Sequence, residues 1–208
     1  MQRLTIDQLA GTEVYVVTLA GDTIRGQYRG STSNQNGLVR MTIKSGDEKM
    51  KLEASNMQLL AVQPGTFAQM GNVALFPALE SIENEAFTEA LPTDGWVFYE
   101  RQRMPTKKER YQLLQVLNRG FDQKVKVYAH PNASSTGGTS LNGIVVEGNL
   151  DNQHFVSVNG GPVFKIDNLG YKKRALKELY SNCELLAGKK LKWKDFARHV
   201  FQYDQECE

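Results

Sequence analysis

The residue types that most often carry catalysis or bind metals are few and scattered in this sequence. Its three histidines are His130, His154 and His199, and its two cysteines are Cys183 and Cys207. No histidine stands at a spacing that would bring a second histidine or a cysteine beside it as a metal ligand, so no metal site is predicted. The sequence also lacks the nucleophile, phosphate-loop and metalloprotease patterns that indicate an active site. We therefore predict a protein that is not an enzyme and has neither a cofactor nor a small-molecule substrate.

The other side chains with a chemical role are the arginines and lysines, which are unevenly distributed. The net charge is only +2, but residues 172–198 hold nine basic residues. Basic runs attract the phosphates of a nucleic acid, although a solvated helix surface is the alternative. The candidates for nucleic-acid contact are Arg25, Arg29, Arg40, Lys172, Lys173 and Arg174, together with Asn36 in a loop of the first third of the chain.

Cysteine content and hydropathy bear on the compartment. Two cysteines are too few for a disulfide framework, so both are predicted to be reduced thiols. No apolar run approaches the roughly 18 residues of a membrane span. The N-terminus, with Asp7 and no apolar core, does not resemble a secretion signal. These features predict a cytoplasmic protein without membrane contact.

The elements that would position the candidate residues are clearest between residues 12 and 62. Val14 and Val16 alternate with polar neighbours, and a turn at residues 20–22 leads to a second alternating run. Such alternation predicts strands with one buried face. Three further short strands are predicted up to Val62, including residues 49–52. Five short, bent strands in about fifty residues can cover one core if they close into a small barrel.

This stretch resembles the Sm-like (LSm) family of small β-barrel proteins. The second motif of that family maps onto residues 52–60. The resemblance implies an SH3-like barrel, RNA binding, and self-assembly into a homo-oligomeric ring through exposed edge strands. The residues that match the first motif are Val14, Val16, Leu19, Gly21, Ile24, Gly26 and Tyr28, and the family's loop asparagine falls on Asn36.

Two departures from the family pattern bear on RNA binding. The usual loop aspartate is Thr32, and the usual Arg-Gly pair is Glu53-Ala54. In the family that arginine helps to hold the RNA base, and a carboxylate in its place repels phosphate. The resemblance therefore implies that the family's uridine site is not preserved in this chain.

The second half of the chain resembles the first. Residues 121–169 follow the order of apolar pairs in residues 10–57, with Val125 and Val127 in the places of Val14 and Val16. We predict a second, diverged barrel here, with an ordinary antiparallel meander as the alternative.

Helices are predicted in the connector and at the C-terminus. Residues 80–91 have helix-forming composition, and Thr106 with Glu109 forms a capping box that predicts a helix over residues 106–120. Residues 171–183 are expected to form another helix. An amphipathic terminal helix is predicted from the spacing of Trp193, Phe196, Ala197, Val200 and Phe201.

The predicted fold is mainly β with α: two small SH3-like or Sm-like barrels joined by a helical connector, followed by C-terminal helices. The predicted domains are the first barrel at 1–65, the connector at 66–120, the second barrel at 121–170, and the basic and amphipathic helices at 171–208.

Two hypotheses of function remain. The first is an Sm-like protein that self-assembles and binds single-stranded RNA or DNA. The second is a structural scaffold that binds other proteins and no nucleic acid, which the loss of the Arg-Gly pair favours. Binding that weakens with salt is expected from the first, and an oligomer of constant mass from the second.

Overall fold

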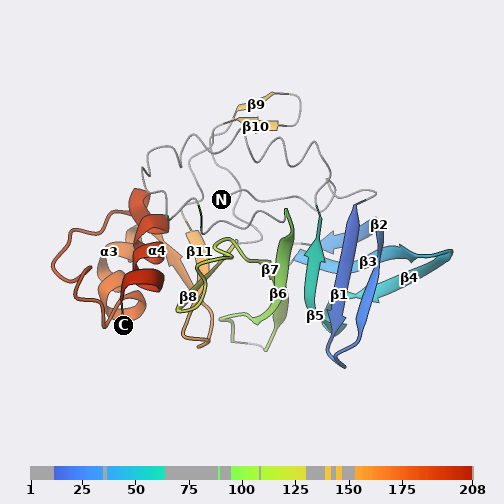
Figure 1. Cartoon of the computed structure of the whole chain (residues 1–208), viewed down its shortest axis with the longest axis horizontal. Helices are drawn as coiled ribbons and strands as arrows, with labels where there is room; N and C mark the ends of the chain where they lie inside the picture. The colour runs from blue at the N-terminus through green and yellow to red at the C-terminus, as the bar shows by residue number, and fades with distance from the viewer. Residues whose placement is uncertain are drawn as a thin grey trace.

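The chain is mainly β and ends in helices (Figure 1), as predicted. The computed structural model describes residues 12–34, 37–63, 89, 95–107, 109–129, 139–141, 144–146 and 153–207. The predicted helix at 80–91 lies outside these residues apart from Glu89, and the candidate residue Asn36 also lies outside them. The described residues form three antiparallel sheets: a seven-stranded sheet, a three-stranded sheet, and the hairpin of β9 (Thr139–Leu141) and β10 (Ile144–Val146).

The larger sheet has the strand order β4-β3-β2-β1-β5-β6-β7. The five strands predicted between residues 12 and 62 are confirmed, and a 3-10 turn, η2 (Ala54–Asn56), joins the last two. The strands are β1 (Glu13–Thr18), β2 (Thr23–Asn34), β3 (Gly37–Ser45), β4 (Glu48–Glu53), β5 (Met57–Val62), β6 (Val97–Arg103) and β7 (Tyr111–Gln115).

The two faces of this sheet follow from the alternation in the sequence. Val14 and Val16 are fully buried on one face, which we call the inner face, and Tyr15 between them lies on the other, the outer face. The inner face carries the first core, whose buried members are Val14, Val16, Tyr28, Met41, Ile43, Met57, Leu60, Val62, Tyr99 and Leu113.

The predicted first barrel is instead an open sheet. β5 pairs with β1 along one edge and with β6 along the other, and β4 and β7 are the two ends of the ladder. Because β6 occupies the second edge of β5, that edge is no longer available to close a five-stranded barrel. The sheet curls around the first core, so that some Cα atoms of β3 and β7 lie within 8 Å of each other.

The helix predicted over residues 106–120 is wrong, because this segment contains β7. Met104 N–H donates to the carbonyl of Arg110, which closes the loop between β6 and β7. β7 then pairs with β6, from Tyr111 opposite Arg103 to Gln115 opposite Tyr99. Burial in the sheet overrides the local helix signal here, and the predicted connector contributes two strands to the first sheet.

The second half forms a smaller unit around a three-stranded sheet. Its strands are β8 (Val125–Ala129), β11 (Gln153–Val158) and β12 (Phe164–Asp167), in the order β12-β11-β8. β8 pairs with β11, and the residues between them include the separate β9–β10 hairpin. In the described residues the predicted second barrel is therefore an open sheet.

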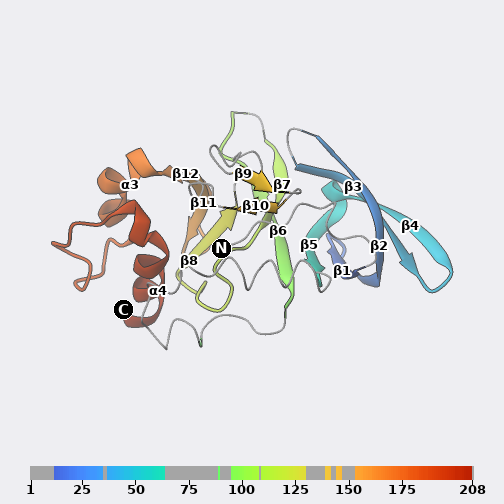
Figure 2. The ribbon, with the colours of Figure 1, turned by 90° about the horizontal axis from the view of Figure 1, so that it is seen from above.

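Two helices cover this smaller sheet (Figures 1 and 2). α3 (Asn168–Arg174) starts at Asp167, whose carboxylate accepts a hydrogen bond from the N–H of Gly170 at 2.6 Å, and it continues as a π-helical turn, η4 (Ala175–Leu179). α4 (Phe196–Glu206) follows a 3-10 turn, η5 (Trp193–Asp195), and confirms the predicted terminal helix. α4 buries Phe196, Val200, Phe201 and Tyr203 in the second core, which lies between this sheet and its helices.

The two sheets are joined through the outer face of β6 and β7. Val116, just after β7, forms a β-bridge with Tyr128 of β8. Asn118, fully buried, then fixes the connection: its amide donates to the carbonyls of Phe121 and Val125, and its oxygen accepts from the N–H of Val127. A small apolar cluster fills the junction and consists of Met104, Leu114, Val116, Tyr128, Phe155 and Val163, with Phe98 beside it.

The two cysteines are joined, which corrects the prediction of reduced thiols. Cys183 and Cys207 form a disulfide whose Cα atoms are 5.2 Å apart. The disulfide ties the end of α4 to the segment after η4. At the same end of α4, Lys124 donates from its ammonium group to the carbonyl of Cys207 and from its backbone N–H to the carboxylate of Asp204. In the part of the chain described here, no helix has the length and apolarity needed to cross a bilayer.

We predict that Gly26→Ala destabilises the first sheet. A Cβ at this position would lie 2.5 Å from the carbonyl oxygen of Lys44, so the backbone of β2 or β3 would have to shift. Overpacking of this kind costs about 1–3 kcal/mol of the free energy of unfolding, measurable by urea titration. The exposed Thr32→Ala on the same strand is the control and should change stability by less than about 0.5 kcal/mol. Equal effects of the two substitutions would contradict the close approach.

We also predict that the disulfide stabilises the second unit. Cys183 and Cys207 are 24 residues apart, and closing a loop of that size contributes about 3 kcal/mol in the chain-entropy model. The free energy of unfolding should fall by about that amount when reductant is added. The double variant Cys183→Ser/Cys207→Ser should be insensitive to reductant. Two thiols that react with a thiol reagent in the denatured, unreduced protein would show that the bond is absent.

Candidate functional site

Basic side chains gather on the outer face of β2, β3 and β4. Cross-strand partners share a face, and Lys44 of β3 lies between Gln27 of β2 and Lys49 of β4. Thr42 is paired with Lys51 in the same way. The cationic face, as we call it, consists of Arg25, Arg29, Arg40, Lys44, Lys49 and Lys51, all exposed except the half-buried Lys44.

The charges of this face are only partly neutralised. Arg40 Nε lies 2.6 Å from the carboxylate of Glu53, and Lys44 Nζ lies 3.4 Å from that of Asp47 at the β3–β4 turn. Arg29 donates instead to the side-chain oxygen of the neutral Gln27 at 2.7 Å. The remaining members, with Arg29, make no ion pair with any residue that the structure describes. An exposed surface with unneutralised cations favours an anionic partner.

An aromatic cluster borders the cationic face on the side of β6. The rings of Tyr15 and Trp96 are 5.4 Å apart between centroids, and those of Tyr15 and Phe98 are 6.1 Å apart. Tyr15 and Phe98 stand on β1 and β6, with β5 between them and Ala61 as the residue paired with both. Backbones two strands apart are about 10 Å from each other. The two rings therefore lean together over the small side chain of Ala61, which is fully buried.

Two arginines contact this aromatic cluster in different ways. Arg119, from the connection between the sheets, lies 4.2 Å above the ring of Phe98 and donates to the carbonyl of Trp96 at 3.3 Å. Arg25, from β2, lies 5.7 Å from the centre of the ring of Tyr15 and is exposed. The connection between the sheets thus contributes Arg119 to one end of the site, and the cationic face contributes Arg25 to the other.

The residues predicted from the sequence fall into separate places. Arg25, Arg29 and Arg40 come together on the cationic face, whereas Lys172, Lys173 and Arg174 lie on α3 at the opposite end of the molecule (Figures 1 and 2). Arg174 is already engaged by the carboxylate of Glu178, by the carbonyl of Lys165 and by the ring of Phe164. The α3 residues therefore cannot belong to the same site as the β2 residues.

Several members of the site were missed by sequence reasoning. Lys44, Lys49 and Lys51 are surrounded by charged residues of both signs, so their composition carried no signal. The alternation of Lys49 and Lys51 with the half-buried Met50 and Leu52 would have placed these two lysines on the outer face. No pattern in the sequence places Trp96 and Phe98 in the site, because only the pairing of β6 with β5 brings them beside Tyr15.

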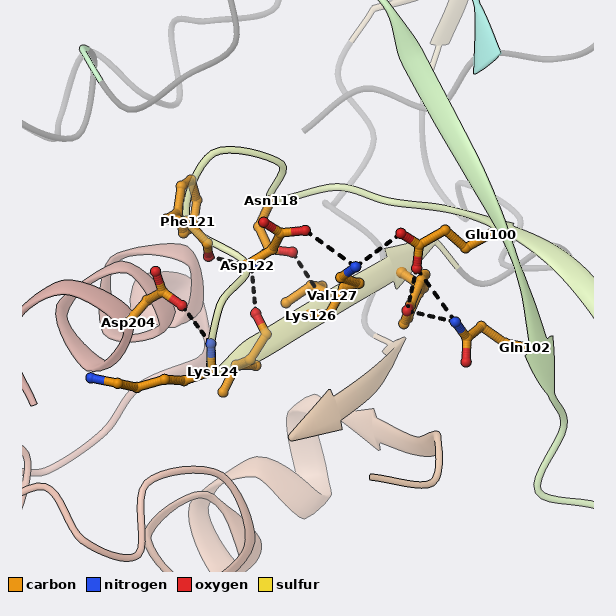
Figure 3. Close-up of polar contacts among 11 residues, drawn as sticks. Glu100, Gln102, Asn118, Phe121, Asp122, Lys124, Lys126, Val127 and Asp204 are labelled. Carbon is orange, nitrogen blue, oxygen red and sulfur yellow. Dashed lines mark hydrogen bonds and ion pairs between the residues drawn. The ribbon is translucent and has the colours of Figure 1, made fainter. Parts of the chain in front are cut away.

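A half-buried polar network joins β6 to β8 (Figure 3). The carboxylate of Glu100 accepts from Lys126 Nζ at 2.9 Å and from the hydroxyl of Tyr128 at 2.9 Å, and Asp122 lies 3.4 Å from the same ammonium group. Gln102 donates to the Tyr128 hydroxyl at 2.7 Å.

The charges of this network shift two pKa values. Burial alone would lower the pKa of Lys126, but the hydrogen bond and charge of Glu100, with the charge of Asp122, raise it above its usual value. Burial, and then Glu100, raise the pKa of Tyr128. Both groups therefore keep their ordinary neutral-pH forms, and the network holds the two sheets together without a reactive group.

The histidines lie in the second unit, away from the cationic face, as far as they are described. His154 in β11 stacks on the rings of Trp193 and Phe196, both 5.5 Å away, and His130 is outside the described residues. Nδ1 of the buried His199 lies 2.7 Å from the hydroxyl of Tyr171, which in turn is 3.2 Å from that of Tyr180.

The His199 cluster is part of the second core. Burial lowers the pKa of His199 to about 4; the charge of Asp195 raises it, and those of Arg198 and Lys189 lower it further. Burial also raises the pKa of Tyr171. His199, Tyr171 and Tyr180 are therefore all neutral at pH 7. Neutral groups suit a packed interior better than they suit proton transfer. Within the described ranges no three residues of the types His, Cys, Asp and Glu are grouped so as to hold a metal ion.

Comparison with known proteins adds no relative to this picture. No protein-family model, no curated protein and no solved structure matches the chain. The site is therefore interpreted from its own geometry.

We predict that His199 makes stability depend on pH between about 4 and 6.5. Its folded-state pKa of about 4 lies below its ordinary value of 6.5. As pH falls through this window the unfolded chain takes up a proton that the folded chain does not, so the free energy of unfolding decreases, by up to about 3 kcal/mol. Below pH 4 this contribution is fully lost and changes no further. His199→Gln should remove that part of the pH dependence, measured by urea unfolding at several pH values; identical curves for both proteins would exclude it.

Proposed function

We propose that the protein binds single-stranded RNA or DNA on the cationic face of the first sheet. The observation that carries this proposal is the alignment of six exposed or half-exposed cations across three adjacent strands, with four of them free of ion pairs in the described structure.

The size of the face suits a short stretch of nucleic acid. β1 to β4 are four neighbouring strands, and three strand spacings cover about 14 Å. Arg25 and Arg29 lie near one end of that distance, and Lys49 and Lys51 near the other. Each cation that neutralises a phosphate releases a bound counterion, so binding is expected to depend on salt.

The aromatic cluster beside the cationic face favours a single strand over a duplex. Bases in a single strand are free to stack on Tyr15 or its neighbours, whereas bases in a duplex are held in pairs. Proteins that bind single strands without sequence preference combine a cationic path with aromatic rings in this way.

The relationship to the Sm-like family and the homo-oligomeric ring remain proposals. The second edge of β5 is occupied by β6, so assembly by strand addition would have to use β4 or β7, the two ends of the sheet. β4 carries Lys49 and Lys51, and lysines on an edge strand oppose strand addition. For this reason we place nucleic-acid binding ahead of the scaffold alternative.

Binding of a labelled mixed-sequence single strand, followed by anisotropy at about 50 and 200 mM salt, tests the proposal. The wild-type protein should bind more weakly at the higher salt. The double variant Arg25→Gln/Arg29→Gln should bind about tenfold more weakly. It should also reduce the magnitude of the slope of log affinity against log salt by about 1.4, because about 0.7 is lost for each of the two phosphate contacts on a single strand.

The matched control is Lys173→Gln, which removes an exposed cation of α3 and should leave affinity and salt slope unchanged. Equal effects of Lys173→Gln and the double variant would mean that charge acts without a defined site. No binding by the wild-type protein, together with a constant oligomer mass in light scattering, would refute the proposal and favour the scaffold.

A further inference from the structure

Three arginines stack on aromatic rings of the first sheet, and they differ in how firmly they are held. Arg101 lies 3.6 Å above the ring of Tyr111 on the inner face. Arg119 lies 4.2 Å above Phe98 and is held a second time by the carbonyl of Trp96. Arg25 is the loosest, at 5.7 Å from the ring of Tyr15.

Arg25 is also the arginine most easily moved. Its guanidinium is exposed, and it makes no hydrogen bond or ion pair with a described residue besides its contact with the ring of Tyr15. A cation–π contact at an exposed site is weak, so leaving the ring is not costly. Tyr15 therefore has one face covered by a side chain that can leave it, whereas Phe98 is covered by an arginine with two attachments.

We propose that the ring of Tyr15 is a stacking site for one unpaired nucleobase, and that Arg25 moves from the ring to the phosphate of that nucleotide. This inference rests on the proposed function and names the residue that contacts a base. Trp96 and Phe98 flank the Tyr15 ring at tilted and perpendicular angles of 57° and 77°, so they form a wall beside the base rather than further parallel platforms.

This arrangement defines the class of ligand. One base enters the site, and it must be free of its pairing partner, because a base within a duplex exposes only its edges. A stacking contact accepts every base, since each has a π face, so little sequence preference is expected. The phosphates on one side of this base continue over Arg29 and Lys44 toward β4.

An all-abasic ten-nucleotide strand, compared with the same strand carrying one base, tests the site with the wild-type protein. Because a stacking contact accepts any base and the strand can shift its register, one base should tighten binding about tenfold over the all-abasic strand, and further bases should add little. A 2-aminopurine used as that single base should be quenched on binding. These measurements need no protein variant and do not depend on whether a substituted chain folds.

Variants at Tyr15 assign the effect to the ring. Tyr15→Leu should weaken binding about tenfold, abolish the abasic effect and leave the salt slope unchanged, whereas Tyr15→Phe should behave like the wild type. The matched control is Tyr111→Leu, which removes the ring under Arg101 on the inner face and should not alter binding. Thermal unfolding of each variant checks that the fold is retained.

The outcomes separate this inference from the proposed function. Salt-dependent binding that is as tight to the all-abasic strand as to the strand with one base, or with Tyr15→Leu as tight as the wild type, would overturn the stacking site and leave the cationic face. Duplex bound as tightly as single strand would also overturn it. No binding of any nucleic acid would overturn both.

Discussion

The pairing of β6 with the second edge of β5 decides the architecture of this protein. The backbone hydrogen bonds along that edge keep the first five strands from closing on themselves and extend them into a sheet that curls around its core. The same pairing brings Phe98 opposite Ala61, and so beside Tyr15, and it aims Glu100 at the second unit. The addition of β6 to the sheet thus creates both the aromatic end of the candidate site and the attachment of the smaller sheet.

The outer face of this sheet is divided in two by what covers it. Over β6 and β7 it is apolar, and residues such as Leu114 and Val116 pack against Tyr128 and Phe155 of the second unit. Over β2 to β4 it is exposed and basic. The boundary falls at β1 and β5, where the rings of Tyr15 and its neighbours lie. The candidate site is therefore the uncovered part of a face whose other part is an interior surface.

The sequence predicted those parts of the fold that depend on near neighbours. The strands between residues 12 and 62 and the helix α4 are confirmed, because their alternation and helical spacing are local properties. The helix predicted at 106–120 was wrong because the structure of this segment depends on distant residues. Its local signals favour a helix, but Leu113 and Leu114 are buried on opposite faces of a sheet. Most other strands of that sheet lie far away in the sequence. The Cys183–Cys207 bond also depends on where α4 docks, which the sequence alone does not reveal.

The candidate site shows the same limit. Arg25, Arg29 and Arg40 were found as cations, but their neighbours Lys49 and Lys51 join them only through the register of β3 and β4. Arg174 was proposed on charge alone, and its ion pair with Glu178 gives it a structural role. Charge in a sequence locates candidates, and pairing across strands decides which of them share a surface.

The buried amide of Asn118 determines where the chain can be divided without loss of packing. Its three hydrogen bonds all reach forward into residues 121–127, so the end of the first sheet is built on the start of the second unit. A chain cut between Asn118 and Phe121 would lose those hydrogen bonds. It would also expose Leu114 and Val116, which form an apolar strip at the end of β7. Each half would therefore lose part of its packing if the chain were divided here.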